Sequence, residues 1–287
     1  KKLITGYVGS TRTATISGTW STNPQSGDAY SIVEAWGTKY INGNCVNPTD
    51  VNHQPFDERN YGFSSGMAVE APLVLPAGSA LISTKSRKTE NDDCTGGWVG
   101  PYSTFTYGCE ILTVVDTVPL ASAFRPAYFG TDKTTHTSDS LHTELLQSVS
   151  RLSCPYSIAT YADQVKRPWL DYLKNFIGRS NHPMANMTNY GRDLTYVLGR
   201  CGLMVNCDFE PEEKLPIIRG LVQIGIDNYY IALVGPACWP QNGGHGTGRV
   251  FPIRFAGLML NHSGMKTIAL TAHETTAYYI GETGVED

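Results

Sequence analysis

The sequence predicts an α+β chain with two parts, a β-sandwich-like module over residues 1–120 and a helical domain over residues 136–287. Short β-branched runs separated by Gly/Asn/Asp loops dominate the first part, as in strands joined by turns. Apolar residues at helical spacing dominate the second part. Residues 121–135 follow neither periodicity and are expected to connect the two.

The β module is predicted from several short strands at irregular spacing. A hairpin is expected from residues 11–20 and 29–36, which flank a turn rich in Asn, Pro, Gly and Asp. Further strands are expected at 71–76, 79–84, 102–107 and 109–115. Many short strands with turn-rich loops are typical of a sandwich, whose loops usually carry recognition.

The helical domain is predicted from segments with an apolar face. They span residues 141–152, 158–173, 192–205, 210–233 and 252–260, and the second is interrupted by Pro168. The fourth has the clearest start, because Pro211 and its acidic neighbours suit the first turn of a helix. Its wide apolar surface predicts packing on more than one side, as in layered helical hairpins. A return to strand is expected at 273–280.

Composition excludes several functional classes. Charged residues make up 17% of the chain and the net charge is −4, so no basic surface for nucleic acid is expected. No apolar run has the length of a membrane span, no Cys/His spacing fits a metal site, and no cofactor is expected. Seven cysteines favour a few disulfides, with Cys45–Cys94 as the first candidate pair, in a secreted or cell-surface protein.

The first candidate site segment is residues 181–193, between two predicted helices. It contains four side chains with useful chemistry: Asn181, His182, Tyr190 and Arg192. A structural interpretation is equally open, in which the segment is a helix-capping loop with Asp193 as the cap and Arg192 solvated.

The second candidate segment, residues 239–249, has four glycines in six residues, which permit close approach by a ligand. Arg249 can clamp a carboxylate through two N–H groups, and His245 can transfer a proton near neutral pH. Trp239 can stack on a sugar ring, and Asn242 lies beside it as a further substrate-binding candidate. The alternative is a glycine-rich interhelical loop in which His245 is bonded to backbone.

Taken together, Asn, His, Tyr and Arg in helix-connecting loops, a β module and a Trp-containing Gly loop resemble polysaccharide lyases built on an α/α toroid. The resemblance implies a partial toroid and an acidic polysaccharide as substrate, eliminated across or hydrolysed. By that resemblance, Asn181 and Arg192 (or Arg249) would neutralise the uronate carboxylate. His182 or His245 would remove the adjacent proton, and Tyr190 would protonate the leaving oxygen.

A second class of function is a non-catalytic surface, adhesion or filament protein that assembles as a homo-oligomer through its β module. The Thr/Ser/Gly/Asn-rich composition and the odd cysteine favour it, whereas the loop around His245 favours the enzyme. The enzyme hypothesis requires both polar segments to line one pocket, with side chains within roughly 10 Å, the reach of a shared sugar.

Overall fold

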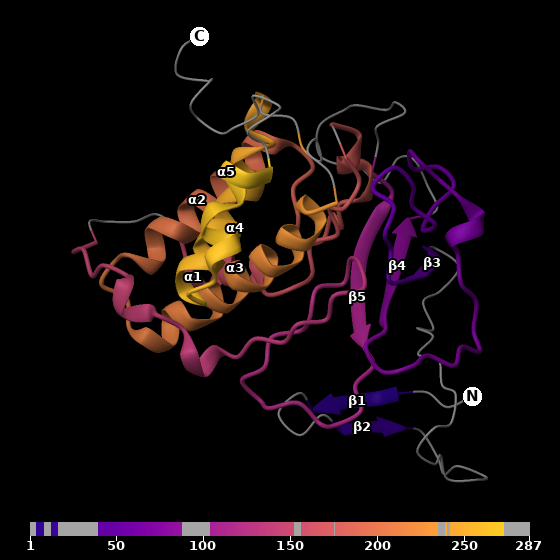
Figure 1. The fold of residues 1–287 in the computed structure, drawn as a ribbon, viewed down its shortest axis with the longest axis horizontal. Coiled ribbons are helices and arrows are strands. Elements are labelled where there is room, and N and C mark those ends of the chain that lie inside the picture. Colours follow the sequence, from indigo (N-terminus) through magenta and orange to yellow (C-terminus); the bar gives the residue numbers. More distant parts are fainter. Residues whose placement is uncertain are drawn as a thin grey trace.

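The computed structural model describes residues 4–8, 13–16, 40–87, 104–151, 156–174, 176–234, 239 and 242–272. Within these ranges it contains a two-stranded pair, a three-stranded sheet and five α-helices. Figure 1 shows the sheet on one side and the helices on the other, with β5 (Thr106–Thr113) as the strand nearest the helices. The α+β prediction is therefore confirmed.

The larger sheet consists of β3 (Tyr40–Val46), β4 (Ala80–Arg87) and β5, all antiparallel, with β4 in the centre. Residues of β4 alternate between buried and half-buried along its whole length, the period-two pattern of a strand with one face on a core. Gly43 is required in β3, because a Cβ there would lie 2.2 Å from the carbonyl oxygen of Phe56.

The prediction of a β-sandwich is wrong. Only three strands form the larger sheet, and the other pair consists of β1 (Ile4–Val8) and β2 (Thr13–Ile16). The structure shows neither a sandwich nor a toroid in the residues that it describes. The strand expected at 29–36 lies outside the described residues.

Several strand boundaries differ from those predicted. Residues 71–76 form no strand, and a single strand, β5, replaces the two expected at 102–107 and 109–115. The sequence of β3 predicts a loop because it contains Asn-Gly-Asn, residues that are rare in strands. Pairing with β4 along its full length, from Tyr40 opposite Arg87 to Val46 opposite Leu81, overrides that local preference.

The five described helices are α1 (Ile158–Val165), α2 (Gly191–Val205), α3 (Pro211–Ala232), α4 (Thr247–Met259) and α5 (Ser263–Ala272). The longest, α3, begins with a capping box in which the Glu210 and Glu213 side chains each bind the other's backbone N–H. α4 packs against α2, α3 and α5. α3 contacts α1, α2 and α4, so the packing on more than one side that its apolar surface predicts is confirmed.

Three helix predictions need correction. The described part of the segment 141–152 contains one short 3-10 turn, Thr143–Leu145, in place of a helix, and Val149 of the expected apolar stripe is exposed. α1 ends at Val165, before Pro168, so the helix expected over 158–173 does not continue past that proline. α4 starts five residues before Pro252, which sequence reasoning placed in the first turn. α5 was not predicted, and the strand expected at 273–280 lies outside the described residues.

One hydrophobic core joins the sheet to the helices. Tyr172, which follows α1, lies at its centre and has no exposed surface. Its ring contacts Phe56 on the sheet side at 6.3 Å between centroids, Phe129 at 5.5 Å and Tyr128 at 6.5 Å. The segment 169–173, which includes Asp171, therefore runs through the middle of the molecule.

The disulfide prediction is wrong for the described cysteines, because Cys45, Cys109, Cys201 and Cys207 are all free. Cys94, the proposed partner of Cys45, lies outside the described residues. Burial raises the pKa of Cys45 to about 11 and that of Cys201 to about 12. These two thiols are therefore protonated at neutral pH and behave as small apolar side chains.

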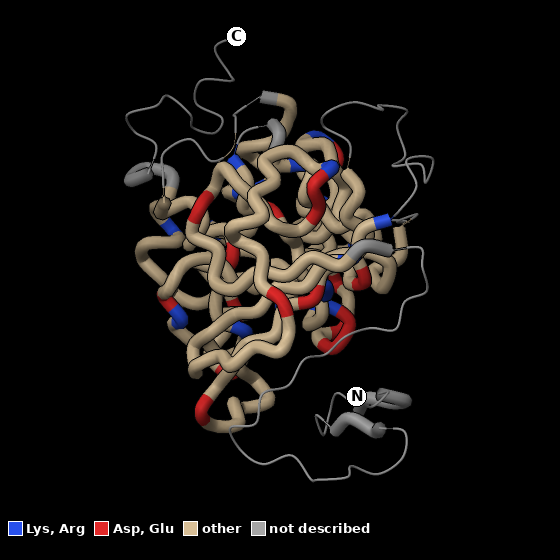
Figure 2. Tube along the Cα trace, turned by 90° about the vertical axis from the view of Figure 1, so that its right-hand side faces the viewer, with Lys and Arg blue, Asp and Glu red and all other residues tan. Residues whose placement is uncertain are grey.

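Charged residues of both signs lie along the described trace. In the view of Figure 2, the blue Lys and Arg positions lie among the red Asp and Glu positions. Across the described ranges, the helices are too short or too polar for a bilayer crossing.

Two glycines test how tightly the helices pack. A Cβ at Gly225 of α3 would lie 2.1 Å from the carbonyl oxygen of Pro252 in α4, whereas a Cβ at Gly199 of α2 meets nothing within 4 Å. We expect Gly225→Ala to lower the free energy of unfolding by about 1–3 kcal/mol through overpacking. Gly199→Ala should raise it by about 0.5–1 kcal/mol because alanine favours helix. Urea denaturation measures the free energy of unfolding of both variants. Equal changes in the two variants would contradict the close packing of α3 against α4.

Candidate functional site

The first polar segment is anchored to the edge of the sheet. The backbone N–H groups of Met184 and Ala185 donate to the carbonyl oxygens of Thr106 and Tyr107 in β5, at 3.1 and 2.9 Å. The Thr104 hydroxyl donates to the Arg179 carbonyl at 2.6 Å. These bonds fix the chain on both sides of His182 and direct this segment into the core.

The second polar segment is fixed by glycines against the start of α2. Gly243 and Gly244 have φ values of 60° and 79°, which other residues rarely adopt. A Cβ at Gly191 would lie 2.5 Å from the backbone nitrogen of His245, so the two chains touch. His245 precedes α4 and Arg249 follows one turn later, so both side chains project from the same side of the helix start.

These two segments converge on Asp171, which comes from the core segment after α1. The Arg249 guanidinium binds the Asp171 carboxylate with two bonds, Nε to Oδ2 at 2.6 Å and Nη2 to Oδ1 at 3.0 Å. His182 Nε2 lies 2.8 Å from the same Oδ1, and Arg249 Nη1 lies 3.2 Å from His245 Nδ1. We call these four residues the Asp171 network; each is at most 2% exposed.

Hydrogen-bond partners define which nitrogens of the network carry hydrogen. His182 Nδ1 lies 2.8 Å from the Thr188 carbonyl oxygen, which only accepts, and its Nε2 faces the Asp171 carboxylate. Both ring nitrogens of His182 therefore face fixed partners, so neither is available to a substrate in this arrangement. His245 Nδ1 accepts from Arg249, so the ring hydrogen of His245 is on Nε2.

The pKa values of two members are strongly perturbed. Burial by itself raises the pKa of Asp171, but Arg249 and His182 overcome it and hold that pKa well below its usual range. Burial, together with the neighbouring Arg249, lowers the pKa of His245 to about 4. At neutral pH, Asp171 is therefore ionised and His245 is uncharged.

Two aromatic residues border the network. The half-buried Tyr190 packs edge-on against His245, with ring centroids 5.4 Å apart. Trp239 was expected to stack on a sugar; it is 7% exposed, and its ring centroid lies 5.9 Å from the Arg249 guanidinium carbon. Tyr190 is thus the more accessible of the two rings.

Asn181 has an unusual environment. Its side chain is fully buried, yet neither its amide nitrogen nor its amide oxygen has a hydrogen-bond partner among the described residues. An unsatisfied buried amide costs about 1–3 kcal/mol, so such groups in folded proteins call for an explanation. A bound polar group is one explanation, and Asn181 directly precedes His182 of the network.

The remaining predicted site residues lie outside the network. Arg192 is exposed and pairs with its neighbour Asp193 at 2.9 Å. Asn242 begins a short 3-10 turn, and its side chain lies outside the described part of the chain. The structure therefore unites His182, His245 and Arg249 but keeps Arg192 apart from them.

Sequence reasoning missed the centre of the network. Asp171 is not among the site residues that the sequence predicts. The available signal was its position within Trp-Leu-Asp-Tyr-Leu, where a lone charge interrupts an apolar run. Charged residues are almost never fully buried unless they are paired, so such a run predicts a cationic partner.

Comparisons with protein-family models, with curated proteins and with solved structures found no match to this chain. Within the described residues, no group of three or more His, Cys, Asp or Glu side chains is arranged to hold a metal ion.

Proposed function

We propose that this chain acts on an acidic polysaccharide and eliminates across the bond next to a uronate unit. The observation that carries the proposal is the convergence of the two polar segments on one network, 3.3 Å apart at His182 Nε2 and Arg249 Nη2. The resemblance to α/α-toroid lyases belongs to the same proposal. The part of that resemblance that we retain is the chemistry of the loops. The sandwich module is not part of the proposal.

Elimination needs three groups, and the site offers a candidate for each. The Asn181 amide, which has no hydrogen-bond partner among the described residues, would bind the uronate carboxylate and mask its charge, which makes the neighbouring C–H proton more acidic. His245, uncharged at neutral pH, would take that proton. The C–H electron pair would form the new double bond, the bond to the leaving oxygen would break, and Tyr190 would supply a proton to that oxygen.

Geometry favours His245 over His182 as the base. Both nitrogens of His182 face fixed partners, whereas His245 Nδ1 accepts from Arg249 across 3.2 Å. A substrate must displace that contact, which is longer than either bond from Arg249 to Asp171. Approach would be from the side of the half-buried Tyr190.

A second function, binding or assembly without catalysis, is favoured by a different observation. Asp171, Arg249 and His182 satisfy one another and are almost fully buried. Such a network is also what a structural clamp between the helices and the sheet edge would require. The two functions differ in whether a product forms.

The test is to incubate the protein with a panel of uronate polymers and follow the ultraviolet absorbance of the double bond that elimination creates. Tyr190→Phe should lower kcat by about 100-fold or more, as expected for loss of a general acid. Tyr196→Phe, at an exposed position on α2, the helix that follows Tyr190, is the matched control and should retain activity. Absence of product with every polymer would reject the elimination and leave the binding function.

A further inference from the structure

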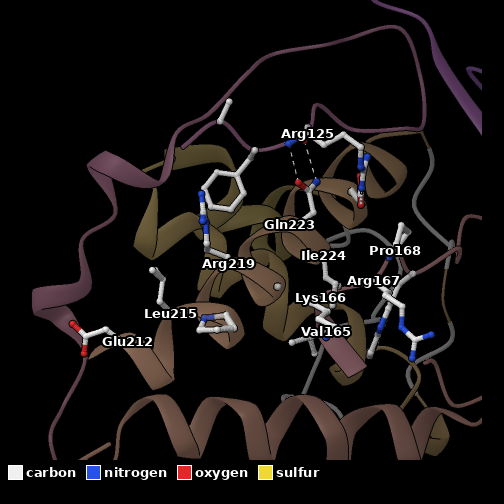
Figure 3. Close-up of a pocket in the computed structure, with 16 residues that line it drawn as sticks. Arg125, Val165, Lys166, Arg167, Pro168, Glu212, Leu215, Arg219, Gln223 and Ile224 are labelled. Atoms are coloured by element: carbon white, nitrogen blue, oxygen red, sulfur yellow. Dashed lines mark hydrogen bonds and ion pairs between the residues drawn. The ribbon is translucent and has the colours of Figure 1, made fainter. Parts of the chain in front are cut away.

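A groove lies between residues 123–125, the end of α1 and α3 (Figure 3). Its volume is about 560 Å³, within the range of small-molecule sites. The Arg125 N–H donates to Gln223 Oε1 and the Gln223 amide donates to the Arg125 carbonyl, both at 3.0 Å. These two bonds fix the loop wall against α3, so the groove is a formed feature of the fold.

The groove has an apolar floor. Val165, Trp169 and Ile224 line it and are each at most 4% exposed. Gly220 brings the walls together, since a Cβ there would lie 2.6 Å from Val165. An apolar base with a few polar groups above it is the usual composition of a ligand site.

Cationic side chains outnumber acidic ones around this floor. The basic lining residues are Arg125, Lys166, Arg167 and Arg219, and the acidic ones are Glu212 and Asp227. Arg125 is neutralised by Asp227, with Nη1 to Oδ1 at 3.0 Å and Nη2 to Oδ2 at 2.5 Å. Lys166 is paired with the exposed Asp163 at 2.5 Å.

The side-chain hydrogen bonds of the other two arginines go to neutral oxygens, and the exposed Asp163, which pairs with Lys166, lies within electrostatic range of Arg167. Arg167 donates to the Ala185 carbonyl at 2.9 Å. Arg219 donates to the Ala121 carbonyl at 3.3 Å and to the Ser138 hydroxyl at 3.0 Å. Each guanidinium has further N–H groups for an anion. In Figure 3 the one remaining acid, Glu212, lies at the opposite end of the groove from Arg167.

From these contacts we infer that the groove binds a uronate unit of an acidic saccharide. The planar guanidinium groups of Arg167 and Arg219 match the geometry of a carboxylate, and the apolar floor takes the ring carbons of the sugar. The saccharide class rests on the proposed function, whereas the site itself rests on the groove and its two arginines. This site is separate from the Asp171 network and supplies binding rather than chemistry.

Calorimetric titration of the whole chain with trigalacturonate, maltotriose and a sulfated carrageenan oligosaccharide tests the inference. Trigalacturonate should bind and the neutral maltotriose should not. Arg167→Gln and Arg219→Gln should each weaken trigalacturonate binding about 10-fold or more, because each removes charge-assisted hydrogen bonds. Arg151→Gln, an exposed arginine outside the groove, should bind as the unmodified chain does.

The outcomes separate the two proposals. Binding of trigalacturonate that neither groove variant weakens would overturn the groove assignment and leave the elimination standing. Groove-dependent binding without any elimination product would support the groove and reject the lyase. Stronger binding of the sulfated oligosaccharide would overturn the assignment to a carboxylate. No binding of any of the three would overturn the groove, even if elimination occurred.

Discussion

Replacing Asp171 by Asn should lower the free energy of unfolding by about 3–5 kcal/mol, the cost of leaving a buried charge without its partner. The Arg249 guanidinium is 2% exposed and donates two bonds to the Asp171 carboxylate. An asparagine at this position would offer Arg249 a single neutral oxygen, and its amide N–H₂ would face another donor. His182 Nε2 would also lose its charged acceptor.

Urea denaturation at neutral pH measures this effect. Asp163→Asn is the matched control, because Asp163 pairs with Lys166 at the surface, with both side chains more than half exposed. Such pairs contribute about 0–1 kcal/mol, so the control should barely change stability. Adding Arg249→Met to Asp171→Asn should recover part of the loss, since the unpaired cation is removed. Equal stability of the two single variants would contradict a buried ionic network.

The second large effect is a pH-dependent loss of stability caused by His245. Its pKa is about 4 in the folded chain and 6.5 in the unfolded chain. Between these pH values the unfolded chain binds a proton that the folded chain does not, so acid favours unfolding. The stabilisation from His245 is complete above pH 6.5 and declines as the pH falls toward 4, by up to about 3 kcal/mol.

His245→Asn should flatten this pH dependence. The Asn side chain retains an oxygen that can accept from Arg249 but has no titrating group. The free energy of unfolding should be measured by urea at several values between pH 7 and pH 4. His142→Asn, at an exposed position, should leave the profile unchanged. Asp171 does not interfere, because its pKa is held well below this range. A profile for His245→Asn that parallels the unmodified chain would show that His245 does not titrate in this window.

The two stability variants also bear on function. If the Asp171 network is only a structural clamp, the variants that lose more stability should also lose more of any activity. Under the elimination hypothesis, Tyr190→Phe should lose activity at nearly unchanged stability, because Tyr190 lies at the edge of the network. The pattern across the three positions therefore distinguishes a clamp from a catalytic centre.

Helices with strong local signals were predictable from the sequence. α3 begins at Pro211 with acids in its first turn, and its apolar residues recur at helical spacing, so its limits follow from local chemistry. α2 was predicted within one residue of its start at Gly191. By contrast, residues 141–152 have a helical stripe but form only short turns, because local periodicity does not determine whether a core is available to cover the stripe.

The β part was less predictable, because strand pairing joins residues that are far apart in the sequence. β3 has weak strand propensity of its own and becomes a strand through hydrogen bonds to β4, which lies well beyond it in the chain, as the pair Tyr40 and Arg87 shows. The sandwich was predicted from the number of short β-branched runs in the sequence. Such runs do not reveal which of them will pair with another strand in the fold.

By itself, the sequence determined an α+β fold, the cores of α2 and α3, and the candidates His182, His245 and Arg249, because these depend on residue type and local spacing. Only the tertiary structure decided that the candidates meet at Asp171 and that Arg192 does not. A buried carboxylate needs cations around it from any part of the chain, and which cations reach it depends on how the helices and the sheet edge pack.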